Sequence, residues 1–160
     1  MKALVVYSSK SGNTKKLAEG LFGALQYEKD LVAMADNPNP ADYDFVAVGF
    51  WVQGGEPDPA TQEFLPKIRD KEVFLFATHG SAKNSDHAKK AMHKAKELVT
   101  SGRITGEFEC PGQVNEKVLE AAAKKDPQPP WLGDAPGAKG HPDEEDIREL
   151  VHLFNELNLP

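Results

Sequence analysis

Short apolar runs recur along the chain, and amphipathic stretches separate most of them. Four runs are continuously apolar, which is typical of strands buried on both faces of a parallel sheet. They cover residues 3–7, 31–35, 45–50 and 73–77, and a weaker fifth run covers residues 103–110. The alternation of strands and helices predicts a three-layer α/β/α fold. Its sheet would be doubly wound, with five parallel strands in the order 2-1-3-4-5.

The amphipathic stretches between the strands carry apolar residues at helical spacing. Residues 14–26 and 86–100 show this pattern most plainly, and Gly102 then stands where a C-terminal cap belongs. A shorter helix is predicted to begin at Asp58 and Pro59, which suit the N-cap and the first helical position.

Prolines and glycines mark the remaining segments. Residues 36–44 hold two prolines and predict a loop between the second and third strands. Residues 126–142 hold five prolines and three glycines and predict an irregular surface loop. Pro142 suits the first position of a last helix, whose first turn then carries acidic residues beside the positive end of the helix dipole. We therefore expect helix capping there, and no bound metal.

Length and composition narrow the class of protein. The 160 residues fit one domain, and we expect residues 1–160 to form it. No apolar run is long enough for a membrane span and no secretory signal is visible, so we expect a cytoplasmic protein without membrane insertion. The single cysteine, Cys110, excludes an internal disulfide. A net charge of −6 disfavours nucleic acid as a partner, because phosphate contacts need a basic surface.

The turn after the first strand carries the most informative chemistry. It opens the first helix, and a helix N-terminus offers unpaired N–H groups and a partial positive charge to a phosphate. Hydroxyl and amide side chains would add donors, a lysine would offset charge, and a glycine lets the backbone approach the ligand. A plain capped turn is the alternative, but this position in an α/β sheet favours phosphate. The residues are Ser9, Lys10, Ser11, Gly12, Asn13 and Thr14.

Two further loops should meet this turn, because the C-terminal ends of parallel strands lie at one edge of a sheet. They are residues 51–57 and residues 78–86. An exposed indole beside glycines suits stacking on a planar ring, with a core tryptophan as the alternative. Histidine side chains in general can exchange a proton near neutral pH, so His79 could relay a proton, tune a redox centre or lie solvated. The residues expected at the ligand are Trp51, Val52, Gln53, Gly54, Thr78, His79, Gly80 and Ser81.

On these motifs the chain resembles the flavodoxin-like family over nearly its whole length. Residues 9–14 match the family's phosphate pattern Ser/Thr-x-Ser/Thr-Gly-x-Ser/Thr, and residues 49–55 resemble the loop that packs on one flavin face. The resemblance implies noncovalent FMN, with its phosphate at residues 9–14 and its isoalloxazine between the other two loops. The chain departs from many flavodoxins in residues 78–86, which contain no aromatic residue to cover the outer flavin face.

The resemblance implies an electron-transfer protein that docks transiently on redox protein partners and has no catalytic residue of its own. An FMN-dependent reductase of a small molecule, such as a quinone or a linear tetrapyrrole, is the alternative. A binding module with a vestigial flavin site is a third possibility. No Gly-x-Gly-x-x-Gly run marks a nicotinamide site, so we expect electrons to arrive from another protein. Because the net charge is −6 and residues 51–57 hold no lysine or arginine, we expect a site that disfavours the negative charge of reduced FMN.

Overall fold

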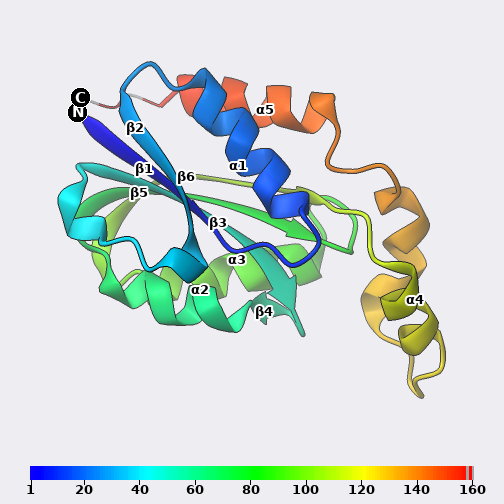
Figure 1. Cartoon of the computed structure of the whole chain (residues 1–160). Coiled ribbons are helices and arrows are strands. Elements are labelled where there is room, and N and C mark those ends of the chain that lie inside the picture. The colour runs from blue at the N-terminus through cyan, green and yellow to red at the C-terminus, as the bar shows by residue number, and fades with distance from the viewer. Residues whose placement is uncertain (158, 160) are drawn as a thin grey trace.

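The computed structural model describes residues 1–157 and 159, and its centre is a parallel sheet with helices on both faces (Figure 1). Neighbouring strands follow the order β2-β1-β3-β5-β6. A short strand, β4 (Glu56–Pro57), pairs antiparallel with the end of β3. The five parallel strands therefore have the predicted 2-1-3-4-5 order, and the predicted fold class is confirmed. They are β1 (Lys2–Tyr7), β2 (Glu28–Ala33), β3 (Phe45–Gln53), β5 (Arg69–His79) and β6 (Ser101–Pro111).

Helices form the two outer layers. On one face α1 (Asn13–Ala24) packs against α5 (Glu144–Asn155), and α2 (Pro59–Phe64) and α3 (Asp86–Leu98) cover the other face (Figure 1). Beyond the C-terminal ends of the strands lie α4 (Glu116–Ala123) and the 3-10 helix η4 (Pro130–Ala138) (Figure 1). Three short 3-10 turns complete the described elements: η1 (Met34–Asp36), η2 (Pro40–Asp42) and η3 (Leu65–Lys67). Within residues 1–157 and 159, no helix is both long and apolar enough to cross a bilayer.

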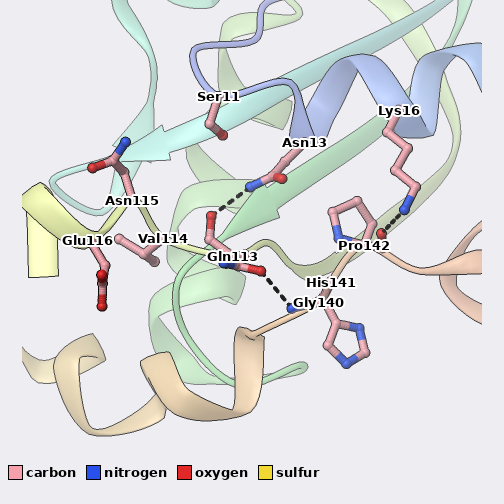
Figure 2. A pocket seen from close by; sticks show the side chains of 10 residues that line it. All are labelled: Ser11, Asn13, Lys16, Gln113, Val114, Asn115, Glu116, Gly140, His141 and Pro142. Atoms are coloured by element: carbon pink, nitrogen blue, oxygen red, sulfur yellow. Dashed lines mark hydrogen bonds between the residues drawn. The ribbon is translucent and has the colours of Figure 1, made fainter.

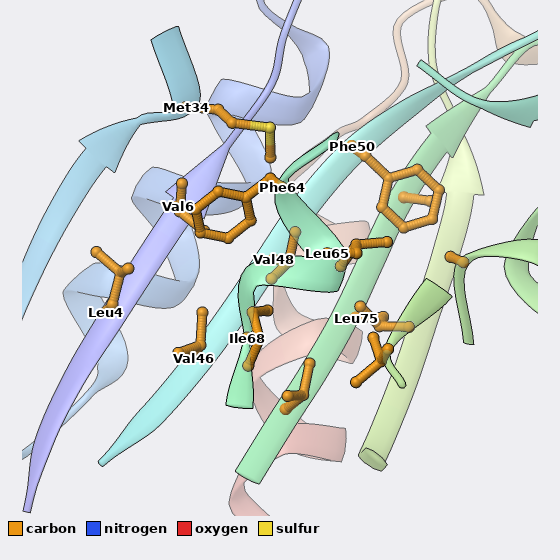
Figure 3. Close-up of a cluster of buried hydrophobic side chains, with 14 of the residues drawn as sticks. Leu4, Val6, Met34, Val46, Val48, Phe50, Phe64, Leu65, Ile68 and Leu75 are labelled. Atoms are coloured by element: carbon orange, nitrogen blue, oxygen red, sulfur yellow. The ribbon is translucent and has the colours of Figure 1, made fainter. Parts of the chain in front are cut away.

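Alternate residues of each central strand build two separate cores, because successive side chains of a strand point to opposite faces. In β1, Leu4 and Val6 pack under α2 and α3, whereas Ala3 and Val5 pack under α1 and α5. Figure 3 shows the first of these cores, which includes Phe64 of α2. Burial on both faces explains why the strands read as continuous apolar runs.

Several boundaries differ from the predictions. The second strand covers Glu28–Ala33 in place of residues 31–35, because an edge strand tolerates the polar residues with which it begins. Gly102 lies inside β6, and Val99 ends α3 in its place. Pro142 precedes α5, because Asp143 is the N-cap in a reciprocal capping box with Asp146.

The segment between β6 and α5 differs most from its prediction. Residues 126–142 were predicted as an irregular loop, yet η4 occupies Pro130–Ala138, and α4 precedes it. Residues 112–141, which we call the strap, thus carry two helical elements past the end of the sheet (Figure 1). The strap places additional side chains next to the predicted ligand loops.

Candidate functional site

An open cleft of about 880 Å³ lies at the C-terminal edge of the sheet and joins all three predicted segments. Of the predicted residues, Ser9, Gly12 and Ser81 do not line the cleft. The others do: Lys10, Ser11, Asn13, Thr14, Trp51, Val52, Gln53, Gly54, Thr78, His79 and Gly80. The convergence predicted from the topology is therefore present in the structure.

The N-terminus of α1 differs from those of the other α-helices in residues 1–157, because no side chain caps it. Its N-cap is Gly12, with a φ of 92° in the left-handed region that glycine tolerates best. By contrast, a side-chain oxygen of the N-cap accepts a backbone N–H bond in each of the others, from Asp58, Ser85, Asn115 and Asp143. The first N–H groups of α1 are therefore available to an anion.

Two of the predicted phosphate ligands use their side chains within the protein. Thr14 is buried, and its hydroxyl oxygen lies 2.9 Å from that of Thr78 on β5. Asn13 donates its amide to the carbonyl oxygen of Gln113 at 3.0 Å, which links α1 to the strap (Figure 2). Among the predicted phosphate residues, Ser11 and Lys10 have side chains that are both exposed and on the cleft.

Further hydrogen bonds fix the strap around a smaller pocket of about 450 Å³, which Asn13 also lines (Figure 2). Lys16 donates to the carbonyl oxygen of Pro142 at 2.6 Å, and the N–H of Gly140 donates to the side-chain oxygen of Gln113 at 2.9 Å. His141 lies 2.6 Å from the carboxylate of Asp146 on α5, and this hydrogen bond raises the pKa of His141. These contacts hold the C-terminal end of the strap against α1 and α5.

Trp51 lies at the end of β3 and not in a loop, because β3 and β4 form a hairpin over the predicted loop residues 51–57. Buried Asp58 accepts bonds from the Trp51 N–H at 3.4 Å and from the Ser8 hydroxyl at 2.6 Å. The ammonium of Lys10 lies 5.5 Å from the centroid of the Trp51 ring, a cation–π geometry. The indole is half-buried, so its face is part of the cleft wall.

His79 is buried at the end of β5, so the solvated alternative is wrong. Its Nε2 is hydrogen-bonded to Glu109, and its Nδ1 accepts the N–H of Ser81 at 3.2 Å. Glu109 also accepts the N–H of Asn84 at 2.9 Å. Burial alone would raise the pKa of Glu109, but the bonds from His79 and Asn84 and the nearby Lys83 charge hold this pKa below its ordinary value. The His79–Glu109 pair thus fixes the turn after β5.

Replacing Glu109 with glutamine should loosen this turn and change how stability depends on pH. The folded-state pKa of Glu109 is lowered, so its contribution is present above the ordinary glutamate pKa and is lost as the pH falls through the lowered value. At neutral pH, Glu109→Gln should therefore lower the free energy of unfolding by about 1–3 kcal/mol. On acidification, this variant should lose less stability than the parent. Urea unfolding at neutral and acidic pH measures both effects. Glu107→Gln, on the same strand with a half-exposed ion pair to Lys96, should change little.

The strap supplies the cleft residues that the sequence analysis missed. An added Cβ at Gly80 would lie 2.9 Å from Val114 and 3.4 Å from the ring of Trp131, so the strap packs directly on the turn after β5. Val118 and Lys125 line the same cleft. A tryptophan in a proline-rich segment was the available signal, and its position depends on contacts distant in sequence.

The cleft is positively charged although the chain is acidic. Its described lining holds Lys10, Lys90 and Lys125 together with two histidines, and it contains no carboxylate. The pKa of one of them, His87, is lowered mainly by burial, and also by its neighbours His79 and Lys90. We expected a site that disfavours the negative charge of reduced FMN. The cleft lining does not support this expectation, because the aspartates and glutamates that make the chain acidic lie outside the lining.

Sequence comparisons find one family and two relatives. A family model described as "Flavodoxin domain" matches residues 4–155. The Flavodoxin-like domain-containing protein BilS of Clostridioides difficile is 29% identical, over 93% of this chain and 92% of the relative. A protein of the same name from Clostridium symbiosum is 25% identical, over 96% of this chain and 94% of the relative.

Solved structures with the same fold include three flavoproteins. A flavoprotein from Lactobacillus acidophilus, solved in complex with FMN, has a TM-score of 0.54 at 20% identity and covers 77% of this chain and 99% of its own. Oxidised flavodoxin 2 from Bacillus cereus has a TM-score of 0.57 at 18% identity, and the match covers 94% of this chain and 99% of the flavodoxin. A Streptococcus pneumoniae flavodoxin has a TM-score of 0.58 at 16% identity, and the match covers 86% of this chain and 99% of the flavodoxin. At these identities the likeness establishes the fold.

Proposed function

Because this chain belongs to the flavodoxin domain family, we propose that it binds FMN in the cleft and carries electrons between redox proteins. The observation that carries the proposal is the uncapped start of α1 beside a cleft lined by Trp51 and three lysines. An uncapped helix start suits a phosphate monoester, and an indole at a cleft wall suits a planar ring. FMN, the cofactor expected from the family, combines these two groups.

The residues present fit the two ends of FMN. Ser11 and the first N–H groups of α1 would bind the phosphate, and Lys10 would offset its charge. Trp51 would stack on one side of the ring, while Thr78 and Gly80 would contact its polar edge. When bound, FMN supplies the one-electron and two-electron chemistry. The protein supplies binding and a water-excluding wall, and its lysines favour the negative charge that full reduction leaves on the cofactor.

An electron carrier suits this chain better than a self-sufficient reductase, because no nicotinamide-binding motif is present in the sequence. Electrons would then enter from a redox protein in the cytoplasm that docks transiently at the cleft mouth. A second function, the reduction of a small molecule, is favoured by the size of the cleft.

A turnover assay separates the two functions. As purified, the protein should show the visible absorption bands of a flavin. After chemical reduction it should pass electrons to cytochrome c, used as a probe acceptor, but it should not oxidise NADH or NADPH with menadione when no other protein is present. Sustained nicotinamide oxidation by the isolated protein would overturn the carrier assignment in favour of a reductase.

A further inference from the structure

We propose that the strap closes over the face of the FMN ring that Trp51 leaves open, and that Trp131 is the residue that covers this face. Asn13 then acts as a positioning residue, because it fastens the strap to the start of α1. The inference rests on the proposed function and deepens it. It assigns a second ring contact to a segment that lies after β6, and it gives Asn13 a role other than phosphate binding.

The positions of the two tryptophans carry the first step. In the sheet β5 lies between β3 and β6, and Trp51 at the end of β3 is in register with Thr78 of β5. The strap leaves from the opposite neighbour, β6, and brings the ring of Trp131 to 3.4 Å from the position of an added Cβ at Gly80. The two indoles therefore approach the end of β5 from opposite sides, and both line the same cleft. A flat ring seated over the end of β5 would lie between them.

Both indoles are available to a ligand. Trp51 and Trp131 are half-buried, and neither belongs to the two hydrophobic cores. Apart from two histidines, they are the aromatic residues of the described cleft lining. Residues 78–86, which form the turn on which Trp131 packs, contain no aromatic residue that could cover the ring. Trp131 is therefore the side chain suited to the open face.

Gln113 joins the two ends of the strap and ties them to α1. Its N–H donates to the carbonyl oxygen of His141 at 2.7 Å, and its side-chain oxygen accepts the N–H of Gly140 at 2.9 Å. Its carbonyl oxygen accepts the side-chain amide of Asn13 at 3.0 Å (Figure 2). Asn13 is the first residue of α1, so the helix start that would bind the phosphate also fixes the base of the strap.

A second bond holds the part of the strap that carries Trp131. Asp134, in the same 3-10 helix, accepts the N–H of Ala82 at 3.3 Å. Ala82 belongs to the turn after β5, on which Trp131 packs. The strap is thus bonded near the phosphate end of the cleft at Asn13 and near its ring end at Ala82. Loss of the Asn13 bond should therefore loosen Trp131 over the ring.

Paired titrations of the flavin-free protein with FMN and with riboflavin test the inference. Trp131→Ala should weaken both flavins by the same factor, about tenfold, because riboflavin keeps the ring and lacks only the phosphate. Asn13→Ala should weaken both by a smaller common factor, about threefold to tenfold, because it acts through the strap. Ser11→Ala is the contrast, since it should weaken FMN by about threefold or more and leave riboflavin within about twofold.

Flavin fluorescence supplies a readout that packing alone would not change. An indole in contact with a flavin quenches its emission, whereas a phenyl ring does not. In Trp51→Phe, the bound FMN should therefore stay dark, because Trp131 still contacts it. The double variant Trp51→Phe/Trp131→Phe keeps a ring at both positions, so it should still bind FMN, and the bound FMN should fluoresce.

Each other result overturns the inference. An unchanged affinity in Trp131→Ala, or a dark double variant, would remove Trp131 from the ring. A loss for FMN alone in Asn13→Ala would make this residue a phosphate ligand. If urea unfolding shows that Trp131→Ala does not fold, the fluorescence of the double variant decides. If the parent binds neither flavin, the proposed function fails and the inference with it, whereas a parent that binds both, with variants that behave otherwise, would overturn the inference alone.

Discussion

Replacing Trp51 with alanine should weaken FMN binding by about tenfold to a hundredfold without unfolding the protein. Stacking of a flat heterocycle on an indole contributes about 1–3 kcal/mol, which corresponds to this range. The side chain is half-buried at the end of β3, so its removal opens the cleft wall and leaves both cores intact. Its backbone remains bonded to Asp58, which keeps the hairpin in place.

Titration of flavin-free protein with FMN, followed by quenching of the flavin fluorescence, measures this effect. Trp51→Phe keeps a smaller ring and should retain most of the affinity, so it serves as the matched control. An unchanged affinity in Trp51→Ala would remove Trp51 from the site. A loss in both variants, accompanied by a lower urea midpoint, would instead indicate a damaged β3–β4 hairpin.

Replacing Gly49 with alanine should cause the largest loss of stability among single-residue changes near the site. Gly49 lies in the central strand β3, and an added Cβ would stand 2.3 Å from one ring carbon of Phe76 and 2.5 Å from another. The same Cβ would lie 3.0 Å from Thr14 at the start of α1. Because Phe76 is fully buried, the ring has no free space to move into. We expect a loss of about 1–3 kcal/mol or more.

Urea unfolding of Gly49→Ala gives this loss directly. Gly23→Ala is the matched control, because Gly23 is exposed in α1 and an added Cβ there meets nothing within 4 Å. That change should raise stability by about 0.4–1 kcal/mol, since alanine reduces the freedom of the unfolded chain. Equal effects of the two substitutions would contradict the packing of Phe76 over Gly49.

The sheet was predictable because its central strands are buried on both faces and therefore read as unbroken apolar runs. The same topology predicts that the strand ends meet, and Ser11, Trp51 and Thr78 do line one cleft. The β3–β4 hairpin was not predictable from apolar runs, because β4 is only Glu56–Pro57 and depends on pairing with residues already assigned to a loop.

The position of the strap and the positive charge of the cleft could not be predicted from the sequence, for a different reason. The position of Trp131 depends on packing against Gly80, and that of Gln113 on the bond from Asn13, across a separation that no local pattern shows. Likewise, a net charge of −6 says nothing of where three lysines gather. Local placement of charge, and not the total, decides which ligand a cleft accepts.

The most direct test of the account is a paired titration of the flavin-free protein with FMN and with riboflavin, which lacks the phosphate. If the uncapped start of α1 binds the phosphate, FMN should bind in one molar equivalent and at least about tenfold more tightly than riboflavin, with the difference shrinking as inorganic phosphate is added. Equal affinities for the two flavins, or no binding of either, would contradict the assignment of residues 9–14 as the phosphate site.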